Sequence, residues 1–336
     1  MPFKIIRNDI TKVAADVIVN TANTEPLVGS GTDAGIYRAA GKEQLLEARR
    51  AIGRIKPGDI AVTEAFDLPA KYIIHAVSRQ WEGGSRDEED ILRSCYRKSL
   101  AKAEELGAKS IAFPIMGSGA HRFQKGMALD IALSEIREFL NHSEMEVILV
   151  VFSTEAFVLS EHLLGDIESF IDANYVEETH MMEYPSREWM EKEKRRYQIL
   201  FGEDLAYDGA DDDQGEELFV ETAPFTEKLW EYIIRSGEQP SDIYKRANMD
   251  RRTFSRIING KTARVSKNDC MALAVALKLS LAESEDFLAR ADWAFNPSSV
   301  FDSIVKKSIA DGRYDIYELD AVLFRYTERT LSKAES

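Results

Sequence analysis

Hydrophobic residues in the first half of the chain occur in two alternating kinds of segment. Short runs that are apolar throughout are typical of strands buried on both faces of a sheet. Longer stretches with apolar residues at helical spacing lie between them. We expect strands at 17–19, 60–63, 72–77, 110–113 and 147–152, and helices near 35–51, 89–106, 126–140 and 155–174. This order predicts an α/β three-layer sandwich with ligand loops at the strand ends.

The pattern changes to helices alone in the last third of the chain. Short amphipathic segments are separated by tight turns, with Ser241 expected to cap one helix and Asn259-Gly260 to end the next. The expected helices are 225–235, 241–247, 251–258, 266–277, 282–291, 299–310 and 316–326. Such a succession predicts an all-α helix-turn-helix bundle.

Charge marks the boundary between the two patterns. Residues 177–221 contain 15 acidic and five basic residues, a net charge of −10 out of −15 for all 336 residues. Such a stretch repels itself and is typical of a solvated spacer, which we expect to be partly helical at 186–197. A chain of this length also exceeds the ~250–300 residues at which one core usually divides. We therefore expect domains at 1–175 and 223–331, joined by an acidic linker at 176–222.

Composition restricts the cellular compartment of the protein and the metal chemistry that we expect of it. The two cysteines, Cys95 and Cys270, lie far apart and form no disulfide framework, which favours a reducing, cytoplasmic compartment. No apolar run approaches ~18 residues, and the N-terminus lacks a hydrophobic signal core, so we expect no membrane span and no secretion. The five histidines show no ligand spacing with either cysteine. We expect no metal and no cofactor.

The segment from Arg7 to Gly41 contains the clearest chemical signal. A strand that ends in polar residues leads to the turn Gly29-Ser30-Gly31-Thr32-Asp33, and an alanine-rich helix follows. Backbone N–H groups at such a turn, together with the helix dipole, favour phosphate oxygens. Neither the G-x-G-x-x-G fingerprint nor a Lys-Ser or Lys-Thr pair after the glycines is present. The segment predicts phosphate binding without ATP hydrolysis.

The same segment resembles the macrodomain family, whose members bind ADP-ribose. The matching motifs are Asn8-Asp9-Ile10-Thr11, Val19-Asn20-Thr21-Ala22-Asn23, Gly29-Ser30-Gly31-Thr32-Asp33 with Ile36-Tyr37-Arg38-Ala39-Ala40-Gly41, and a second loop from Ala112 to Phe123. Their order and spacing agree with the family over roughly the first 175 residues. The resemblance implies a macrodomain fold and ADP-ribose or a derivative as the ligand.

The resemblance also implies which residues bind. Asp9 would accept a hydrogen bond from the adenine amino group, although an Asp here could also simply cap the turn, and Ile10 would add an apolar wall. Two glycine loops would hold the diphosphate, with Phe123 against the distal ribose. The loop residues are Gly29, Ser30, Gly31 and Thr32, and on the other side Ser118, Gly119, Ala120, His121 and Arg122. His121 and Arg122 depart from the family pattern.

Asn23 and Asp33 are the candidates for catalysis. In macrodomains that remove ADP-ribose from acidic side chains, or deacetylate O-acetyl-ADP-ribose, the matching residues position or activate a water. A carboxylate beside a diphosphate would also hold a proton more readily. Asp33 is equally suited to the first turn of a helix, and Ser30 could crowd the water. We interpret Asn20 as a brace behind the loop and His75, within an apolar strand, as a core histidine.

The segment Ser241 to Gly260 resembles the Cro/repressor family of helix-turn-helix proteins. Residues 245–267 carry eight bases against one acid. The resemblance implies a recognition helix whose solvent side could contact phosphates and base edges. The candidate residues are Arg251, Arg252, Ser255, Arg256, Asn259 and Lys261, with Phe254, Ile257 and Ile258 turned inward. The alternative is a basic face that packs on the acidic linker or on a protein.

Two interpretations of function follow. In the first, the macrodomain senses ADP-ribose or a derivative in nucleotide signalling, and the helical domain responds through DNA or a protein partner. In the second, the chain is an ADP-ribosyl hydrolase or O-acetyl-ADP-ribose deacetylase acting on carboxylate-linked ADP-ribose. Asn23 and Asp33 favour the enzyme, whereas Ser30, Arg122 and the appended domain favour sensing. Sequence-specific DNA binding would in addition imply a homodimer.

Overall fold

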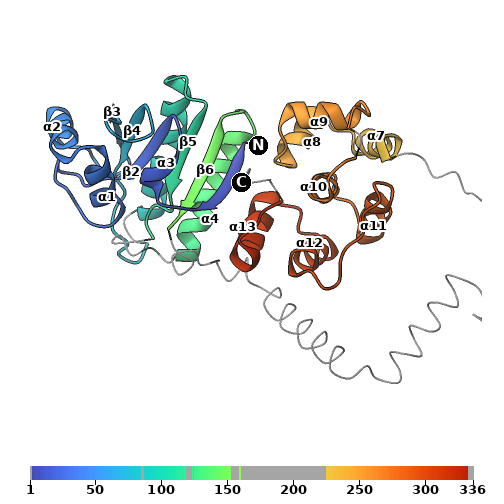
Figure 1. Ribbon diagram of the computed structural model, residues 1–336. Helices are drawn as coiled ribbons and strands as arrows, with labels where there is room; N and C mark the ends of the chain where they lie inside the picture. The colour runs from blue at the N-terminus through green and yellow to red at the C-terminus, as the bar shows by residue number, and fades with distance from the viewer. Residues whose placement is uncertain are drawn as a thin grey trace, which may run out of the picture.

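The computed structural model describes residues 2–84, 87–118, 123, 125–152, 159, 225–262 and 264–331. Within them an α/β region and a helical region lie side by side (Figure 1). The expected linker at 176–222, the helices expected at 155–174 and 186–197, and the domain boundaries at 175 and 222 lie outside the described residues. These expectations remain predictions.

A six-stranded mixed sheet forms the centre of the α/β region. Its spatial order is β1-β6-β5-β2-β4-β3, and every pair is parallel except the antiparallel pair of β3 and β4. The strands are β1 (Phe3–Arg7), β2 (Val17–Thr21), β3 (Ile60–Glu64), β4 (Tyr72–Ala76), β5 (Ser110–Pro114) and β6 (Glu146–Val151). The carboxyl ends of β1, β6, β5 and β2 therefore meet along one edge, where open α/β sheets place ligands.

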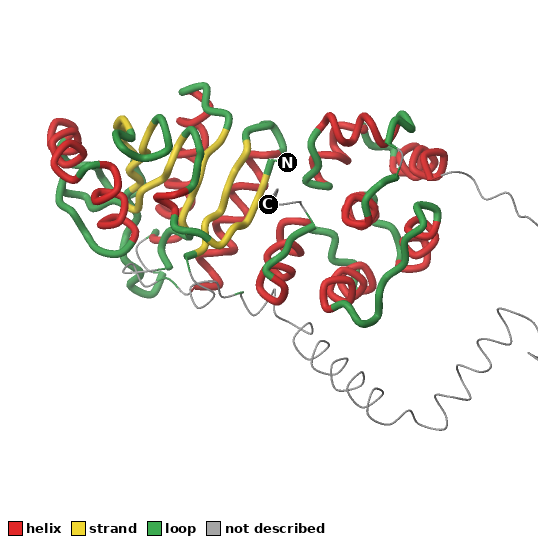
Figure 2. The backbone as a smooth tube through the Cα atoms, viewed as in Figure 1, coloured by secondary structure: helices red, strands yellow, loops and turns green. Residues whose placement is uncertain are grey.

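Helices cover both faces of the sheet, as the sequence predicted (Figure 2). On β2, Ile18 packs in one buried cluster with α1 and α2, whereas Val17 and Val19 pack in another with α3 and α4. The alternation follows the two-residue period of a strand. The helices are α1 (Thr32–Ala40), α2 (Lys42–Ile52), α3 (Glu88–Glu105) and α4 (Lys125–Leu140), with the short 3-10 helix η1 (Ile10–Lys12).

The single helix expected at 35–51 is wrong. Two helices occupy this stretch, and Gly41 separates them with a φ of 91°. A positive φ interrupts the helical backbone and is accessible mainly to glycine. Helix α1 also starts earlier than expected, at Thr32, which brings its N-terminus directly behind the glycine turn.

The second region is helical throughout its described residues. Its helices are α7 (Phe225–Ser236), α8 (Pro240–Arg246), α9 (Arg251–Ile258), α10 (Lys267–Ala276), α11 (Leu281–Ala289), α12 (Val300–Ala310) and α13 (Ile316–Thr327). Five of them begin at an Asp or Ser whose side chain accepts a hydrogen bond from the first turn. The expected cap at Ser241 is wrong: α8 begins one residue earlier, with Pro240 at its first position and Gln239 as N-cap.

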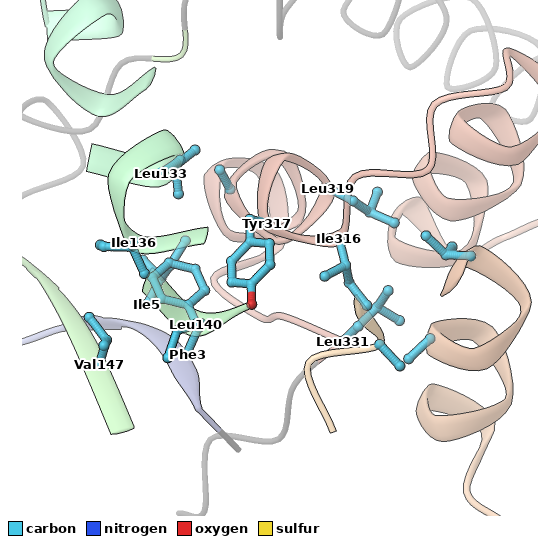
Figure 3. Close-up of a cluster of buried hydrophobic side chains, with 14 of the residues drawn as sticks. Phe3, Ile5, Leu133, Ile136, Leu140, Val147, Ile316, Tyr317, Leu319 and Leu331 are labelled. Carbon is cyan, nitrogen blue, oxygen red and sulfur yellow. The ribbon is translucent and has the colours of Figure 1, made fainter. Parts of the chain in front are cut away.

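The two regions share one hydrophobic core. The ring of Tyr317 of α13 packs at a tilt against the ring of Phe3 of the edge strand β1, with ring centroids 5.2 Å apart. Figure 3 shows these two side chains surrounded by apolar residues of both regions, among them Ile5, Leu133, Ile136, Leu140, Ile316, Leu319 and Leu331. The helical region is thus docked on the sheet edge and on α4.

Polar contacts surround this shared core. The side-chain amide of Asn248, in the turn between α8 and α9, bonds to both the N–H and the carbonyl of Phe3. Arg7, at the other end of β1, forms an ion pair with Glu328 at 2.7 Å. An edge strand presents unpaired backbone groups, and here Asn248 of the helical region pairs those of Phe3.

Candidate functional site

Two adjoining cavities lie at the strand ends of the α/β region. One has a volume of about 370 Å³ and the other of about 190 Å³. Both are lined by Gly31, Thr32 and Pro114, so they adjoin, and together they are called the cleft. An elongated ligand could span both cavities, with its middle at the glycine turn.

Asp9 and Ile10, which the sequence predicts to bind the ligand, both line the larger cavity. Its walls also include Thr11, Arg38 and the side chain of Phe152, which is 77% exposed. Asp9 Oδ1 accepts hydrogen bonds from Thr11 Oγ1 at 2.8 Å and Thr11 N at 3.0 Å. These bonds lower the pKa of Asp9 and keep the carboxylate ionised. Asp9 therefore caps η1 and lines the cavity at the same time, and the exposed ring of Phe152, directly after β6, lines the same cavity.

The smaller cavity is built on the turn from Gly29 to Asp33. Gly31 precedes α1 with a φ of 60°, and no side chain caps this helix. Thr32 and Asp33, in the first turn of this helix, line the cavity, and the N–H groups of a helix N-terminus suit an anion. Gly29 packs so closely that a Cβ would lie 2.8 Å from Asn23 Nδ2 and 3.1 Å from Asp33 Oδ2. A side chain at position 29 would displace both candidate catalytic residues.

Asp33 is held on both of its carboxylate oxygens. Oδ2 accepts from Gly29 N at 2.6 Å and Oδ1 accepts from Asn20 Nδ2 at 2.7 Å. Its side chain lines the smaller cavity, although the residue is only 3% exposed. Burial raises the pKa of Asp33, while the bonds from Gly29 and Asn20 and the charge of Arg49 oppose that rise. A carboxylate with a raised pKa at the end of a cleft is suited to proton transfer.

Asn23 lines the same cavity from the end of β2. Its Nδ2 donates to the carbonyl of Leu27 at 3.1 Å, which leaves Oδ1 available to a ligand hydroxyl. From below, the guanidinium of Arg49 donates to the Asn23 carbonyl at 3.3 Å and to that of Gly53 at 2.8 Å. Arg49 is 1% exposed, and no motif in the sequence indicates this role for it.

Asn20 and His75 both lie beneath the smaller cavity, and His75 is a core residue, as its position in an apolar strand predicted. Both are fully buried, and Asn20 braces Asp33 as expected. The ring of His75 contacts Asn20 on one side and Thr63 on the other, at 3.2 and 3.0 Å. Burial lowers the pKa of His75 to about 3, so the ring is neutral at physiological pH.

The second loop is described only in part. Ser118, a predicted ligand-binding residue, lines the smaller cavity, and its hydroxyl donates to the carbonyl of Ile115. Phe123 does not reach either cavity: it is 3% exposed and packs on Trp81, with ring centroids 5.0 Å apart. Gly117, with a φ of 88°, makes room for that ring. Gly119, Ala120, His121 and Arg122 lie outside the described residues.

The residues predicted to contact nucleic acid form one exposed basic face on and after α9. Arg251, Arg252, Ser255, Arg256, Asn259 and Lys261 are all exposed. Phe254 and Ile257 are buried, and Ile258 is partly buried. Asp250 caps the helix by accepting from Thr253 N at 2.8 Å. Asn259 is engaged locally, because its Nδ2 donates to the carbonyl of Ser255 at 2.7 Å.

Two further findings concern the described part of the chain alone. It contains no cluster of three or more His, Cys, Asp or Glu side chains that could hold a metal ion. None of its helices combines the length and apolar character required to cross a membrane. Cys95 and Cys270 are both buried and free.

Known proteins resemble this chain in the α/β region. The sequence model of the family described as Macro domain matches residues 19–132. A macro domain-containing protein of Methanosarcina mazei is 42% identical over 155 residues, which cover 46% of this chain and 82% of that protein. An O-acetyl-ADP-ribose deacetylase of Enterobacter cloacae subsp. cloacae is 41% identical over 166 residues, or 48% of this chain and 92% of the enzyme. The solved macrodomain of Oceanobacillus iheyensis with ADP is 34% identical to this chain and has a TM-score of 0.44. The match covers 46% of this chain and 85% of the solved macrodomain.

Proposed function

Because the chain belongs to the macro domain family, we propose that its cleft binds ADP-ribose or an ADP-ribose derivative. The observation that carries this proposal is the pair of adjoining cavities, with Asp9 in the larger and Asn23 and Asp33 in the smaller. Adenine would lie in the larger cavity against Phe152, and the amino group would donate to Asp9. The diphosphate would face the uncapped start of α1, and the distal ribose would face Asn23.

The test is titration calorimetry with ADP-ribose, ADP and AMP. We expect ADP-ribose to bind most tightly, because it alone fills both cavities, and AMP to bind most weakly. Glucose 6-phosphate serves as a control that has a phosphate and a sugar but no adenine. If ADP-ribose binds no better than this control, the proposed function is wrong.

We also propose, as the second candidate function, hydrolysis of ADP-ribosyl or acetyl esters in the same cleft. A relative that is 41% identical is named an O-acetyl-ADP-ribose deacetylase. Asn23 would orient the distal ribose and Asp33 would accept a proton from the attacking water. Ser30 also lines this cavity, and its side chain could crowd the attacking water. Release of acetate or of ADP-ribose from a carboxylate-linked substrate tests this candidate, and binding without turnover supports a sensor instead.

For the helical region we propose an output role, with α8 and α9 as a helix-turn-helix and the exposed basic face of α9 as a surface for DNA. The docking of the two regions supports coupling, because β1 connects them directly. The strand begins at Phe3, which the α8–α9 turn holds, and ends at Arg7, two residues before Asp9. A ligand at Asp9 and a partner at α9 would therefore act on the two ends of one strand. Binding to a palindromic DNA site would require a homodimer.

A further inference from the structure

Four buried polar side chains form one hydrogen-bonded chain beneath the cleft. It runs from Asp33 Oδ1 to Asn20 Nδ2 (2.7 Å), from the same nitrogen to His75 Nδ1 (3.2 Å), and from His75 Nε2 to Thr63 Oγ1 (3.0 Å). Asn20 and His75 are 0%, Asp33 3% and Thr63 7% exposed. Asn20 and His75 are register partners on the neighbouring strands β2 and β4. The chain thus crosses the sheet from the cleft to the edge strand β3.

The chemistry of these groups fixes the direction of each hydrogen bond. A carboxylate accepts only, so the Asn20 atom facing Asp33 is its amide nitrogen. One hydrogen of that nitrogen points at Asp33, and the second is available to His75 Nδ1. Nδ1 is then an acceptor, which places the proton of the neutral ring on Nε2, facing Thr63 Oγ1. The opposite arrangement of the Asn20 amide would set two acceptors against each other.

We propose that Asn20, His75 and Thr63 are positioning residues that hold the Asp33 carboxylate, and through it the phosphate turn, in the shape that receives the ligand. Asp33 Oδ2 is the acceptor that keeps Gly29 N at 2.6 Å, so a rotation of the carboxylate would release the turn. Asn20 Oδ1 is buried and has no partner among the described residues, so the amide is held only through its nitrogen. The proposal rests on the proposed function of the cleft.

Arg49 complements this chain from the other side of the site. Its buried guanidinium holds the carbonyl of Asn23 and provides positive charge near Asp33. Uncompensated burial of a carboxylate is costly. The two residues that face the distal end of the cleft are therefore each held from behind, Asp33 by the hydrogen-bonded chain and Asn23 by Arg49.

The experiment uses the full chain with two disrupting variants and two controls. Thr63→Val keeps the shape but removes the acceptor, and His75→Leu removes both ring nitrogens. His75→Gln retains one acceptor and one donor and should restore function in part. Ser99→Ala removes a buried hydroxyl from α3 that is not part of the hydrogen-bonded chain of Asp33, Asn20, His75 and Thr63. We expect Thr63→Val and His75→Leu to weaken ADP-ribose binding about tenfold, the effect of one lost hydrogen bond, while AMP affinity changes less than twofold.

Nitrogen-15 NMR of the histidine rings tests the hydrogen-bonded chain without a ligand, because it reports which ring nitrogen of His75 carries the proton. We expect wild-type His75 to be neutral, with its proton on Nε2, and Thr63→Val to shift that signal. A proton on Nδ1 would overturn the proposal. So would unchanged ADP-ribose affinity in both variants, or equal losses for ADP-ribose and AMP, which would indicate a general loss of folding. A wild type that binds neither ligand would refute the proposed function, and the NMR result would still decide the proton positions.

Discussion

The side-chain amide of Asn248 pairs with the backbone of Phe3 as a neighbouring strand would. Its Oδ1 accepts from Phe3 N at 3.0 Å and its Nδ2 donates to Phe3 O at 3.0 Å. Asn248 has a φ of 49° and is fully buried, a conformation that Asn tolerates better than most residues. The sheet edge is thus completed by a residue 245 positions away in sequence.

Replacing Asn248 should destabilise the α/β region and the helical region together. Asn248→Ala leaves two buried backbone groups of Phe3 unpaired, and each costs about 1–3 kcal/mol. Asn248→Gly is the matched variant, because it removes the same amide but accommodates the positive φ. We expect urea denaturation to show a single transition at lower urea for both variants, with Ala the less stable. Two separate transitions in the wild type would contradict a shared core.

Asp9 should contribute to ADP-ribose affinity apart from its capping of η1. Asp9→Asn keeps an oxygen for the Thr11 bonds but presents an amide to the adenine amino group. We expect Asp9→Asn and Asp9→Ala to weaken binding ten- to hundredfold, from about 1.5–3 kcal/mol for a bond to a charged group. Glu47→Ala, which removes an exposed carboxylate on α2, serves as the control. If only Asp9→Ala weakens binding, Asp9 is a cap and not a ligand.

If the cleft is hydrolytic, Asn23→Ala and Asp33→Ala should lower turnover of an ester-linked ADP-ribose substrate by about 10²–10⁴-fold. Asp33→Ala should also weaken binding, because Gly29 N and Asn20 Nδ2 lose their acceptor. Asn23→Ala loses contact mainly with the distal ribose, so its ADP affinity should remain near that of wild type. Initial rates and calorimetry on the same preparations separate these effects. Unchanged rates in both variants would assign the chemistry to other residues.

The sequence predicted the bounds of the helices and strands better than the contacts between residues that lie far apart in sequence. The helices of the second region begin and end within two residues of the expected positions, because caps and helix breakers are local signals. Asn20 was correctly interpreted as a brace, since the motif places it behind the turn. The roles of Arg49, Thr63 and Asn248 could not be predicted, because each depends on which strands become neighbours. Phe123 shows the same limit: its motif position implies a ligand contact, while the structure packs its ring on Trp81.

His75 should make the protein less stable in acid. Its pKa is about 3 in the folded chain and 6.5 ordinarily, so between these values only the unfolded state takes up the proton. The free energy of unfolding should fall as pH drops below about 6.5, by up to about 1.4 kcal/mol per pH unit from this residue alone. His75→Gln should remove that part of the slope in urea denaturation at pH 7 and pH 5. Equal slopes in wild type and His75→Gln would show that the ring titrates normally.

The basic face of α9 should bind duplex DNA in a salt-dependent way. If Arg251, Arg252 and Arg256 neutralise phosphates, affinity should fall with salt at a slope of about −0.9 for each contact. The double variant Arg252→Glu with Arg256→Glu should flatten that slope by about two contacts. Lys42→Glu with Arg50→Glu changes the net charge equally on the exposed side of α2 and should leave the slope as in wild type.

Gel shifts at low salt, with and without ADP-ribose, test this surface and its coupling to the cleft together. A ligand that binds at Asp9 should change DNA affinity, and by linkage DNA should change ADP-ribose affinity by the same factor. Asn248→Gly should reduce that factor, because it releases β1 from the α8–α9 turn. DNA binding that is indifferent to ADP-ribose would separate the two activities. No retardation of the wild type at low salt would leave the basic face of α9 as a protein-binding surface.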